Sequence, residues 1–440
     1  MDNYPKSYIT VAFIAGILIT LGFKDVYPDL ERRFRRRYNS RSGTEPVPGI
    51  GDHVTLADYS HKQYSTVPDV KIPVGIEGCI GNTPLFKIKS LSDATGCEIL
   101  AKAEVPFPDL ETTMTFLNGA GNSPKDRVAL SIIQMAEEER LLTPNSGDVI
   151  YEGTVGSTGI SLATICRARG YSAHICMPDD QATEKSDLLL KLGAVVEPVK
   201  PASIVDQGQF VNVARKRAEQ HTLDPTKPGR GFFADQFENT ANWRAHFTGT
   251  GPEIYRQTGG HIDAFVAGAG TGGTISGVAL FLKSRLDSVR IVLADPQGSG
   301  LFNRVKYGVM FDPKEREGTR RRHQVDTIVE GIGINRVTAN FEAGRELVDD
   351  AIRVNDEQAM AMARWLVEKD GIFAGSSSAV NCVAAAKLAM EMGPGNRIVT
   401  ILCDSGTRHL SKFWAKAGAI GGDDPSPDLN SILRLGDITT

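Results

Sequence analysis

The sequence predicts an α/β fold built from two open parallel β-sheets with helices packed against them. Two series of short apolar, β-rich runs alternate with helical patterns, which is typical of βαβ units. The 440 residues favour two domains over one, and a content of 41% hydrophobic and 23% charged residues is that of a globular chain. In such folds ligands bind beyond the carboxyl ends of the strands.

The individual elements follow from the same alternation. The first series predicts a strand at 148–153, a helix at 157–170, a strand at 172–178, a helix at 182–193 and a strand at 194–200. The second predicts a strand at 261–267, a helix at 272–285, a strand at 290–296 and a buried strand with its turn at 396–406.

Changes in composition suggest where the domains begin and end. A linker rich in Gly, Pro, Ser and Asp precedes the first periodic apolar residues, and only a short stretch follows the last strand. The expected division is an anchor with its basic flank at 1–38, a linker at 39–71, a smaller domain at 72–240 whose first strands can cross to its neighbour, a larger domain at 241–420 and a tail at 421–440.

The N-terminal region contains a candidate membrane anchor. Residues 7–23 carry no charge and are mostly apolar, at the short end of what a membrane-spanning helix requires. Arginines at 32, 33, 35, 36, 37 and 41 follow it and predict that the remaining chain stays on the cytosolic side. A cleaved signal and a transit peptide fit less well, because the charge follows the apolar run and the run is not amphipathic.

Charge and cysteine content exclude several classes of protein. With 49 Lys and Arg against 53 Asp and Glu the net charge is −4, so nucleic acid is not an expected partner. The six cysteines lie far apart, without a C-x-x-C pair or a Cys/His cluster at metal-ligand spacing. We expect reduced thiols and no metal site.

A glycine-rich loop between a predicted strand and helix, Gly268-Ala-Gly-Thr-Gly-Gly-Thr274, is suited to phosphate. Glycines allow backbone N–H groups to approach an anion at the start of a helix, and the hydroxyls of Thr271 and Thr274 add donors. The spacing also satisfies G-x-G-x-x-G, and Asp295 closes the next strand, so a dinucleotide-binding fold stays open on this loop alone.

Lys125 is a candidate imine-forming amine. The residues after it repeat apolar side chains at helical spacing, which predicts that a helix starts close to Lys125. We expect the helix dipole and the neighbouring Arg127 to disfavour the ammonium form and lower the pKa of Lys125. A solvated surface lysine is the alternative.

A second glycine-rich turn, Glu152-Gly-Thr-Val-Gly-Ser-Thr-Gly159, follows the strand at 148–153 and opens a helix. It can present N–H groups and hydroxyls to a carboxylate or a phosphate. Two anion-receptive helix starts and an amine that forms imines are the groups that pyridoxal phosphate and an amino-acid substrate require.

Six motifs in order give the chain a resemblance to a known family. They are Gly81-Asn-Thr-Pro-Leu85, Ser123-Pro-Lys-Asp-Arg127, Glu152 to Gly159, Gln236-Phe-Glu-Asn239, Gly270-Thr-Gly-Gly-Thr274 and Gly375-Ser-Ser-Ser-Ala379. Over about Ile72 to Trp414 the chain resembles the cysteine synthase and cystathionine β-synthase family, and more narrowly the membrane-anchored fungal cysteine synthase-like proteins of the mitochondrial outer membrane.

The resemblance implies a type II pyridoxal-phosphate fold, with the cofactor between two α/β domains and a homodimer as the usual assembly. It implies that Lys125 holds the cofactor and acts as catalytic base, and that Ser377 faces the ring nitrogen. The further residues it implies are Gly270, Thr271, Gly272, Gly273 and Thr274 for the phosphate, Ser157 for the ring oxygen, and Thr154, Gly156, Thr158 and Gln236 for the substrate.

The reaction implied by the resemblance is β-replacement. Sulfide would displace acetate from O-acetyl-L-serine through an aminoacrylate intermediate and give L-cysteine. A cysteine desulfhydrase on the same scaffold is the nearest alternative, since the same residues could form that intermediate from cysteine and release sulfide. A cystathionine β-synthase is less favoured because only a short tail follows Trp414.

Two departures from the family pattern favour a further alternative. Val155 and Ser157 stand where the family commonly has serine and asparagine, so Ser157 is expected to reach the ring oxygen only through water. The segment 105–115 looks like an insertion near the site. A catalytically silent, membrane-tethered relative therefore stays open at this stage, although Lys125 argues against it.

Overall fold

The computed structural model describes residues 73–104, 122–181, 183–311, 327–418 and 427–436. They belong to one compact unit, Lys71–Thr440. The predicted anchor at 7–23, its basic flank, the linker and the predicted insertion at 105–115 lie outside the described residues. Within the described ranges, no helix is long and apolar enough to span a membrane.

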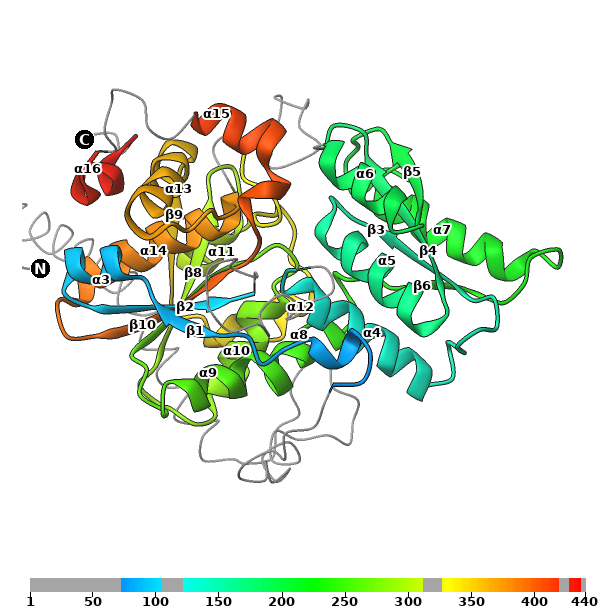
Figure 1. The fold of residues 1–440 in the computed structure, drawn as a ribbon, viewed down its shortest axis with the longest axis horizontal. Helices are drawn as coiled ribbons and strands as arrows, with labels where there is room; N and C mark the ends of the chain where they lie inside the picture. Colours follow the sequence, from blue (N-terminus) through cyan, green and yellow to red (C-terminus); the bar gives the residue numbers. More distant parts are fainter. Residues whose placement is uncertain (1–72, 105–121, 182, 312–326, 419–426, 437–440) are drawn as a thin grey trace, which may run out of the picture. The chain divides into compact units, whose positions relative to one another are not determined.

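One half of the unit is organised around a six-stranded sheet of order β1-β2-β10-β7-β8-β9 (Figure 1). All neighbours are parallel except β1 and β2, which pair antiparallel. The strands are β1 Leu85–Lys87, β2 Glu98–Ala103, β7 Ala264–Gly268, β8 Arg290–Pro296, β9 Asp350–Val354 and β10 Arg397–Leu402.

The other half is organised around a four-stranded parallel sheet of order β5-β4-β3-β6. Its strands are β3 Val149–Gly153, β4 Ser172–Pro178, β5 Val195–Val199 and β6 Gly231–Phe233. The two open, mostly parallel sheets confirm the predicted α/β class, and each predicted strand is present within a few residues of its expected bounds.

Helices complete both halves. The helices of eight or more residues are α4 Lys125–Glu138, α5 Ser157–Arg169, α6 Thr183–Lys191, α7 Phe210–Leu223, α10 Gly273–Lys283, α13 Asp356–Asp370 and α14 Ser376–Met392. The shorter helical segments include α3 Lys89–Thr95, α8 Ala241–Ala245, the π-turn η3 His246–Thr250, α9 Gly251–Gln257, α11 Leu301–Tyr307, the π-turn η7 Leu410–Trp414 and α16 Leu429–Arg434.

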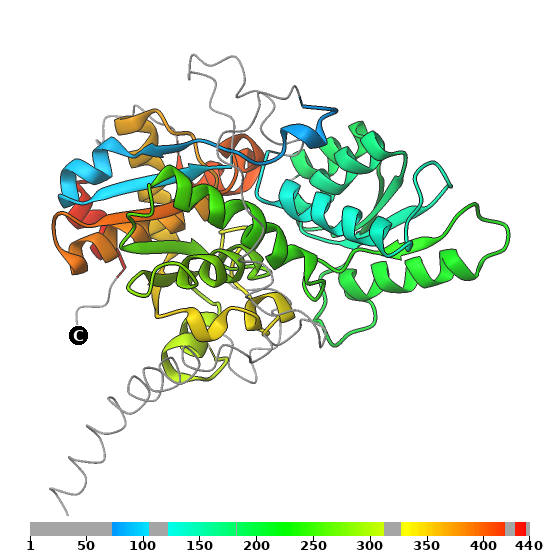
Figure 2. The ribbon, with the colours of Figure 1, turned by 90° about the horizontal axis from the view of Figure 1, so that it is seen from below.

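The core shows how the elements around the pocket pack together. Helix α14 is rich in alanine and buried along almost its whole length, so it packs closely against β10 and β7. Figures 1 and 2 show α13 and α14 on one side of the six-stranded sheet and α8, α9 and α10 on the other. Around the four-stranded sheet, α4 and α5 contribute to a second apolar cluster.

The C-terminal tail packs onto the six-stranded half. Leu429, Ile432 and Leu433 of α16 are buried in its core. Gln358 Nε2 of α13 donates to Leu433 O at 2.9 Å. The described part of the predicted tail, 427–436, thus contains a helix, α16, that is integral to the fold.

Candidate active site

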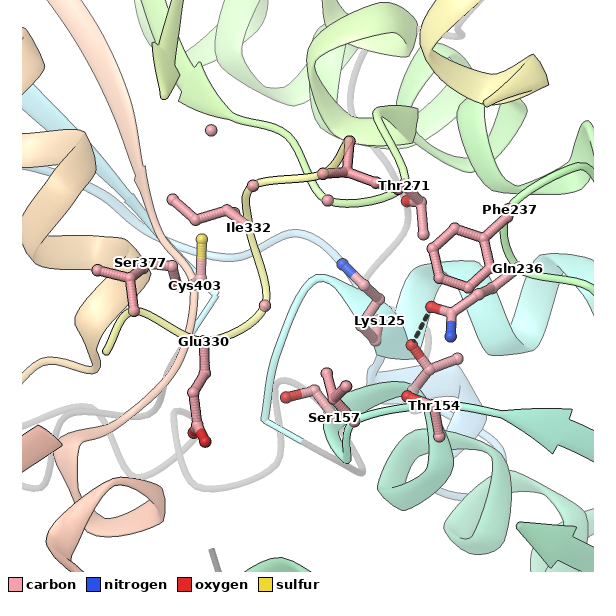
Figure 3. A pocket seen from close by; sticks show the side chains of 18 of the residues that line it. Lys125, Thr154, Ser157, Gln236, Phe237, Thr271, Glu330, Ile332, Ser377 and Cys403 are labelled. Atoms are coloured by element: carbon pink, nitrogen blue, oxygen red, sulfur yellow. Dashed lines mark hydrogen bonds between the residues drawn. The ribbon is translucent and has the colours of Figure 1, made fainter. Parts of the chain in front are cut away.

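A cavity of about 450 Å³ lies at the carboxyl ends of strands from both sheets. Strand β3 leads into Thr154, β7 ends at Gly268, and β10 runs into Cys403, and all three residues line the cavity. This is the position expected for a ligand of an open α/β fold. Figure 3 shows the side chain of Lys125 pointing into this pocket.

Lys125 is the first residue of α4, as predicted. In the described part of the chain no carboxylate lies within ion-pair distance of its Nζ atom. Burial disfavours the ammonium and lowers the pKa of Lys125 despite the opposing fields of Cys403 and Asp404. The predicted direction of the shift is confirmed, and its cause is burial.

Contrary to the prediction, Arg127 is not among the groups that shift the pKa of Lys125, and its guanidinium is paired with two carboxylates. Its Nε donates to Glu104 Oε2 at 2.9 Å, and its Nη1 pairs with Glu253 Oε1 at 2.7 Å. These two carboxylates come from the end of β2 and from α9. The pairs fasten the first turn of α4, and therefore Lys125, to the six-stranded half.

The glycine-rich loop 268–274 forms one wall of the pocket. Gly270, Thr271, Gly272 and Thr274 line the cavity, and α10 begins at Gly273. Gly273 lies behind the wall, since a Cβ there would fall 1.9 Å from Asn242 Oδ1. Free N–H groups at a helix start and two hydroxyls make this wall suited to an anion.

The second glycine-rich turn supplies another wall. Thr154, Ser157 and Thr158 line the pocket, and α5 begins at Ser157. Gly156 supports the turn from behind with a φ of 137°, a conformation that L side chains rarely adopt. The structure thus brings the predicted substrate residues together at a helix N-terminus.

Gln236 lines the same wall and is held by its neighbours. Thr158 Oγ1 donates to Gln236 Oε1 at 2.6 Å, the contact drawn in Figure 3. Gln236 Nε2 lies 3.2 Å from Glu152 Oε1, and Glu152 is fully buried. Burial, reinforced by Asp235, raises the pKa of Glu152 to about 8.

Ser377 lies opposite these walls, in the first turn of α14. The N-cap of α14 is Gly375, so Ser377 lies inside the first turn and does not cap the helix. Its hydroxyl is next to the Cys403 thiol, whose pKa burial and Asp404 raise to about 12. Ser377 therefore presents a neutral polar group to the pocket.

A charged cluster at the pocket was missed by the sequence analysis. Glu330 lies 3.2 Å from His409 Nδ1 and pairs with Lys185, while His409 Nε2 lies 2.9 Å from Asp404 Oδ2. All four residues line the pocket, as does Lys412. Gly331 and Gly333, with φ of 86° and 87°, carry the Glu330 loop beside the glycine-rich loop, and this Gly-x-Gly pair is the signal that could have revealed it.

The dinucleotide-binding interpretation is not supported by the position of Asp295. This carboxylate is fully buried, accepts a hydrogen bond from Phe302 N at 2.7 Å and does not line the pocket. It is thus unavailable to a ribose. All six cysteines are unpaired, as predicted.

Outside the pocket, His174, Cys176 and Glu197 place possible metal-binding atoms near one another on β4 and β5. Arg217 occupies both carboxylate oxygens of Glu197, at 2.7 Å from Oε1 and 3.1 Å from Oε2. The guanidinium already neutralises the carboxylate on which a cation would depend.

Residues 76–404 match the family of pyridoxal-phosphate dependent enzymes. The chain is 64% identical over 432 residues to Cysteine synthase 2 of Emericella nidulans, covering 96% of each chain. It is 55% identical over 370 residues to a Saccharomyces cerevisiae protein provisionally named mitochondrial cysteine synthase, covering 83% of this chain and 91% of that protein.

Among solved structures, the O-acetylserine dependent cystathionine beta-synthase from Helicobacter pylori superposes with a TM-score of 0.62 at 30% identity, covering 78% of this chain and 98% of that one. Together with the type II fold, these similarities place the chain in one class. It belongs to the family of pyridoxal-phosphate dependent enzymes.

The residues of the pocket fit that cofactor. A lysine amine with a lowered pKa faces an anion-receptive helix start, and a neutral hydroxyl lies across from both. These are the groups needed for an aldehyde, a phosphate and a ring nitrogen.

Proposed function

We propose that this chain forms L-cysteine from O-acetyl-L-serine and sulfide with pyridoxal phosphate as cofactor. The observation that carries the proposal is the Lys125 amine, without a carboxylate partner in the described part of the chain, in a pocket with two anion-receptive helix starts. The 64% identity to a cysteine synthase favours synthesis over the desulfhydrase and silent alternatives.

When bound, the cofactor withdraws electrons from the substrate α-carbon and allows a β-substituent to leave. Lys125 would hold it, and Gly270 to Thr274 would receive its phosphate. Ser377 would face the ring nitrogen and Ser157 the ring oxygen. A hydroxyl at Ser377 favours elimination and replacement over transamination, because it does not hold a proton on the ring as a carboxylate would.

The other residues act on the substrate and on protons. Thr154, Gly156 and Thr158 would bind the substrate carboxylate at the start of α5, with Gln236 fixing the Thr158 hydroxyl. Burial lowers the pKa of Lys125 and so favours its neutral amine, and Nζ can then take the α-proton and later return it.

The test is an absorption spectrum of the full chain in detergent with added O-acetyl-L-serine, together with a cysteine-formation assay. We expect a visible cofactor band that O-acetyl-L-serine shifts, and cysteine once sulfide is added. Lys125→Ala should lose the band and lower turnover by at least about 10³-fold. A band that ignores O-acetyl-L-serine while cysteine is degraded would instead indicate a desulfhydrase.

We further infer that residues 7–23 anchor the protein in the mitochondrial outer membrane, with the catalytic unit facing the cytosol. The support is the uncharged apolar run with its following arginines and the similarity to a provisionally mitochondrial yeast protein. After carbonate extraction of mitochondria, the full chain should stay in the membrane pellet, and protease added outside should digest it. Release into the supernatant would contradict the anchor.

We also infer a homodimer, and a division into a smaller domain within 72–240 and a larger one within 241–420. The support is the family membership and the two sheets, with β1 and β2 crossing into the six-stranded sheet. Sedimentation of the detergent-solubilised chain tests the dimer, and a monomer at micromolar concentration would contradict it.

A further inference from the structure

Two buried side chains behind the glycine-rich loop contact its two threonine hydroxyls. Asn242 in α8 and His246 at the start of η3 are 0% and 1% exposed and lie four residues apart. Asn242 Nδ2 is 2.9 Å from Thr271 Oγ1, and His246 Nε2 is 3.2 Å from Thr274 Oγ1. Both threonines line the pocket, but neither Asn242 nor His246 does.

Close helix packing brings these side chains to the loop. The segment α8–η3 packs directly on α10, where a Cβ at Gly277 would fall 2.7 Å from His246 Cβ. The segment widens into a π-turn at His246–Thr250, a distortion that is frequent at functional sites. No larger residue at position 277 would allow this approach.

The hydrogen bond between Asn242 and Thr271 has a defined direction. Asn242 Nδ2 lies 2.7 Å from the backbone oxygen of Gln236, which can only accept, so this end of the amide is the nitrogen. The second N–H of Nδ2 then donates to Thr271 Oγ1. The hydroxyl proton of Thr271 is left for a different acceptor.

The bond between His246 and Thr274 has the same direction. Thr250 Oγ1 lies 2.9 Å from His246 Nδ1, and in the described part of the chain the buried Thr250 hydroxyl makes no other hydrogen bond. Only with Thr250 donating to Nδ1 does its buried hydroxyl proton have a partner, so we infer this direction. Burial, together with Arg127 and Lys125, lowers the pKa of His246 well below its ordinary value, so the ring is neutral. A neutral ring that accepts at Nδ1 carries its proton on Nε2 and donates to Thr274 Oγ1.

We propose that Asn242 and His246 are positioning residues that direct the hydroxyl protons of Thr271 and Thr274 into the pocket, as donors to the cofactor phosphate. Each threonine oxygen already receives a hydrogen bond from behind, so each hydroxyl has its proton available for an anion. The inference rests on the proposed function in that pyridoxal phosphate supplies the phosphate.

The test compares pyridoxal phosphate with pyridoxal, which lacks the phosphate, by equilibrium dialysis against the cofactor-free full chain. His246→Leu and Asn242→Leu should each weaken pyridoxal phosphate binding by about 10- to 100-fold, the loss of a hydrogen bond to a charged group. Pyridoxal should be unaffected within about threefold. His246→Gln, whose side-chain N–H can replace Nε2–H, should restore most of the affinity.

A second pair of variants distinguishes the loss of a hydrogen bond from misfolding. Thr250→Val replaces the hydroxyl that donates to His246 Nδ1, and with it the contact that selects the ring tautomer, and should weaken pyridoxal phosphate binding. Thr248→Val, on the same π-turn but exposed, should not. Equal losses for pyridoxal and pyridoxal phosphate in the leucine variants, or no loss for either, would overturn the proposal.

The ring tautomer can be read without activity. In the ¹⁵N spectrum of chain labelled at histidine, the signals missing in His246→Gln should show a protonated Nε2 and an unprotonated Nδ1. A proton on Nδ1, or titration near neutral pH, would overturn the proposal. If the wild-type chain took up no pyridoxal phosphate, the proposed function would fail, while this spectrum would still decide the hydrogen-bond directions.

Discussion

Gly270 leaves no room for a side chain at the wall that faces the proposed phosphate. A Cβ there would fall 2.3 Å from Gly331 O, a backbone atom of the neighbouring loop. That loop is itself fixed, because Gly333 N donates to Ala269 O at 2.8 Å. The two loops therefore hold each other at a spacing that only glycine permits at position 270.

Gly270→Ala should accordingly separate the two loops and weaken pyridoxal phosphate binding by at least about tenfold, the loss of one or more charge-assisted hydrogen bonds. Equilibrium dialysis measures the affinity, and circular dichroism checks that the fold persists. Gly208→Ala is the matched control, because the exposed Gly208 has only the flexible Asp206 side chain nearby, at 3.3 Å. Unchanged affinity in Gly270→Ala would contradict the close approach.

At the scale of elements, the turn after β10 is held by a charged histidine. His409 is 1% exposed and lies between Asp404 and Glu330. Burial opposes its charge, but the two carboxylates raise the pKa of His409 to about 9. The imidazolium therefore ties the end of β10 to the Glu330 loop.

This pairing makes stability depend on pH. The pKa of His409 is higher in the folded than in the unfolded chain, where it is near 6.5, so the folded chain binds the proton more tightly. The stabilisation is complete below about pH 6.5 and is lost as the pH rises through about 9, for a total of roughly 3 kcal/mol. Urea unfolding at pH 6.5 and pH 9.5 should show the wild-type advantage over His409→Asn shrinking at the higher pH. An advantage independent of pH would contradict the charged state.

The elements also show what local sequence can and cannot predict. The strands β3, β4, β5, β7, β8 and β10 were predicted because each is an apolar run bounded by turn residues. Strand β1 has only three residues, and β2 carries the buried Lys102, whose charge breaks the apolar pattern. Their place in the six-stranded sheet depends on pairing with distant β10, which no local pattern contains.

The residues of the site likewise fall into those that a local sequence pattern predicts and those that only the fold brings together. Lys125 and both glycine-rich turns are contiguous motifs, so the sequence revealed them. Glu330, His409 and Lys185 lie on three separate segments and meet only in the fold. His246 and Asn242 act from behind the wall, and their contacts depend on the packing of α8 and η3 against α10.

At the scale of the whole unit, the two halves meet at the pocket through adjacent residues of α6. Lys185 pairs with Glu330, and Glu184 accepts hydrogen bonds from Ser411 N at 2.9 Å and Ser411 Oγ at 2.7 Å. The Lys185 stem also packs beneath the substrate turn, where a Cβ at Gly156 would fall 2.5 Å from Lys185 Cδ. One side chain thus joins the substrate turn to the opposite half.

The two partners of this pair should differ in their effect on stability. Glu330→Gln leaves the buried Lys185 facing the His409 imidazolium without a counter-charge, so we expect a loss of about 3 to 5 kcal/mol. Lys185→Met should cost less, because Glu330 keeps His409 and Lys412, at 3.2 and 3.3 Å. Urea unfolding of both variants and of the double variant gives the coupling, which should make the double loss smaller than the sum.

The same ion pair should affect activity mainly through substrate binding. Without the Lys185 ammonium, the substrate turn loses its link to the six-stranded half, and the proposed carboxylate site is held less firmly. Lys185→Met should therefore raise the KM for O-acetyl-L-serine by about tenfold and leave pyridoxal phosphate affinity within about threefold. Lys191→Met, at the exposed end of the same helix, should behave as the wild type in steady-state assays. If the two variants had equal KM values, the ion pair would stabilise the fold without positioning the turn.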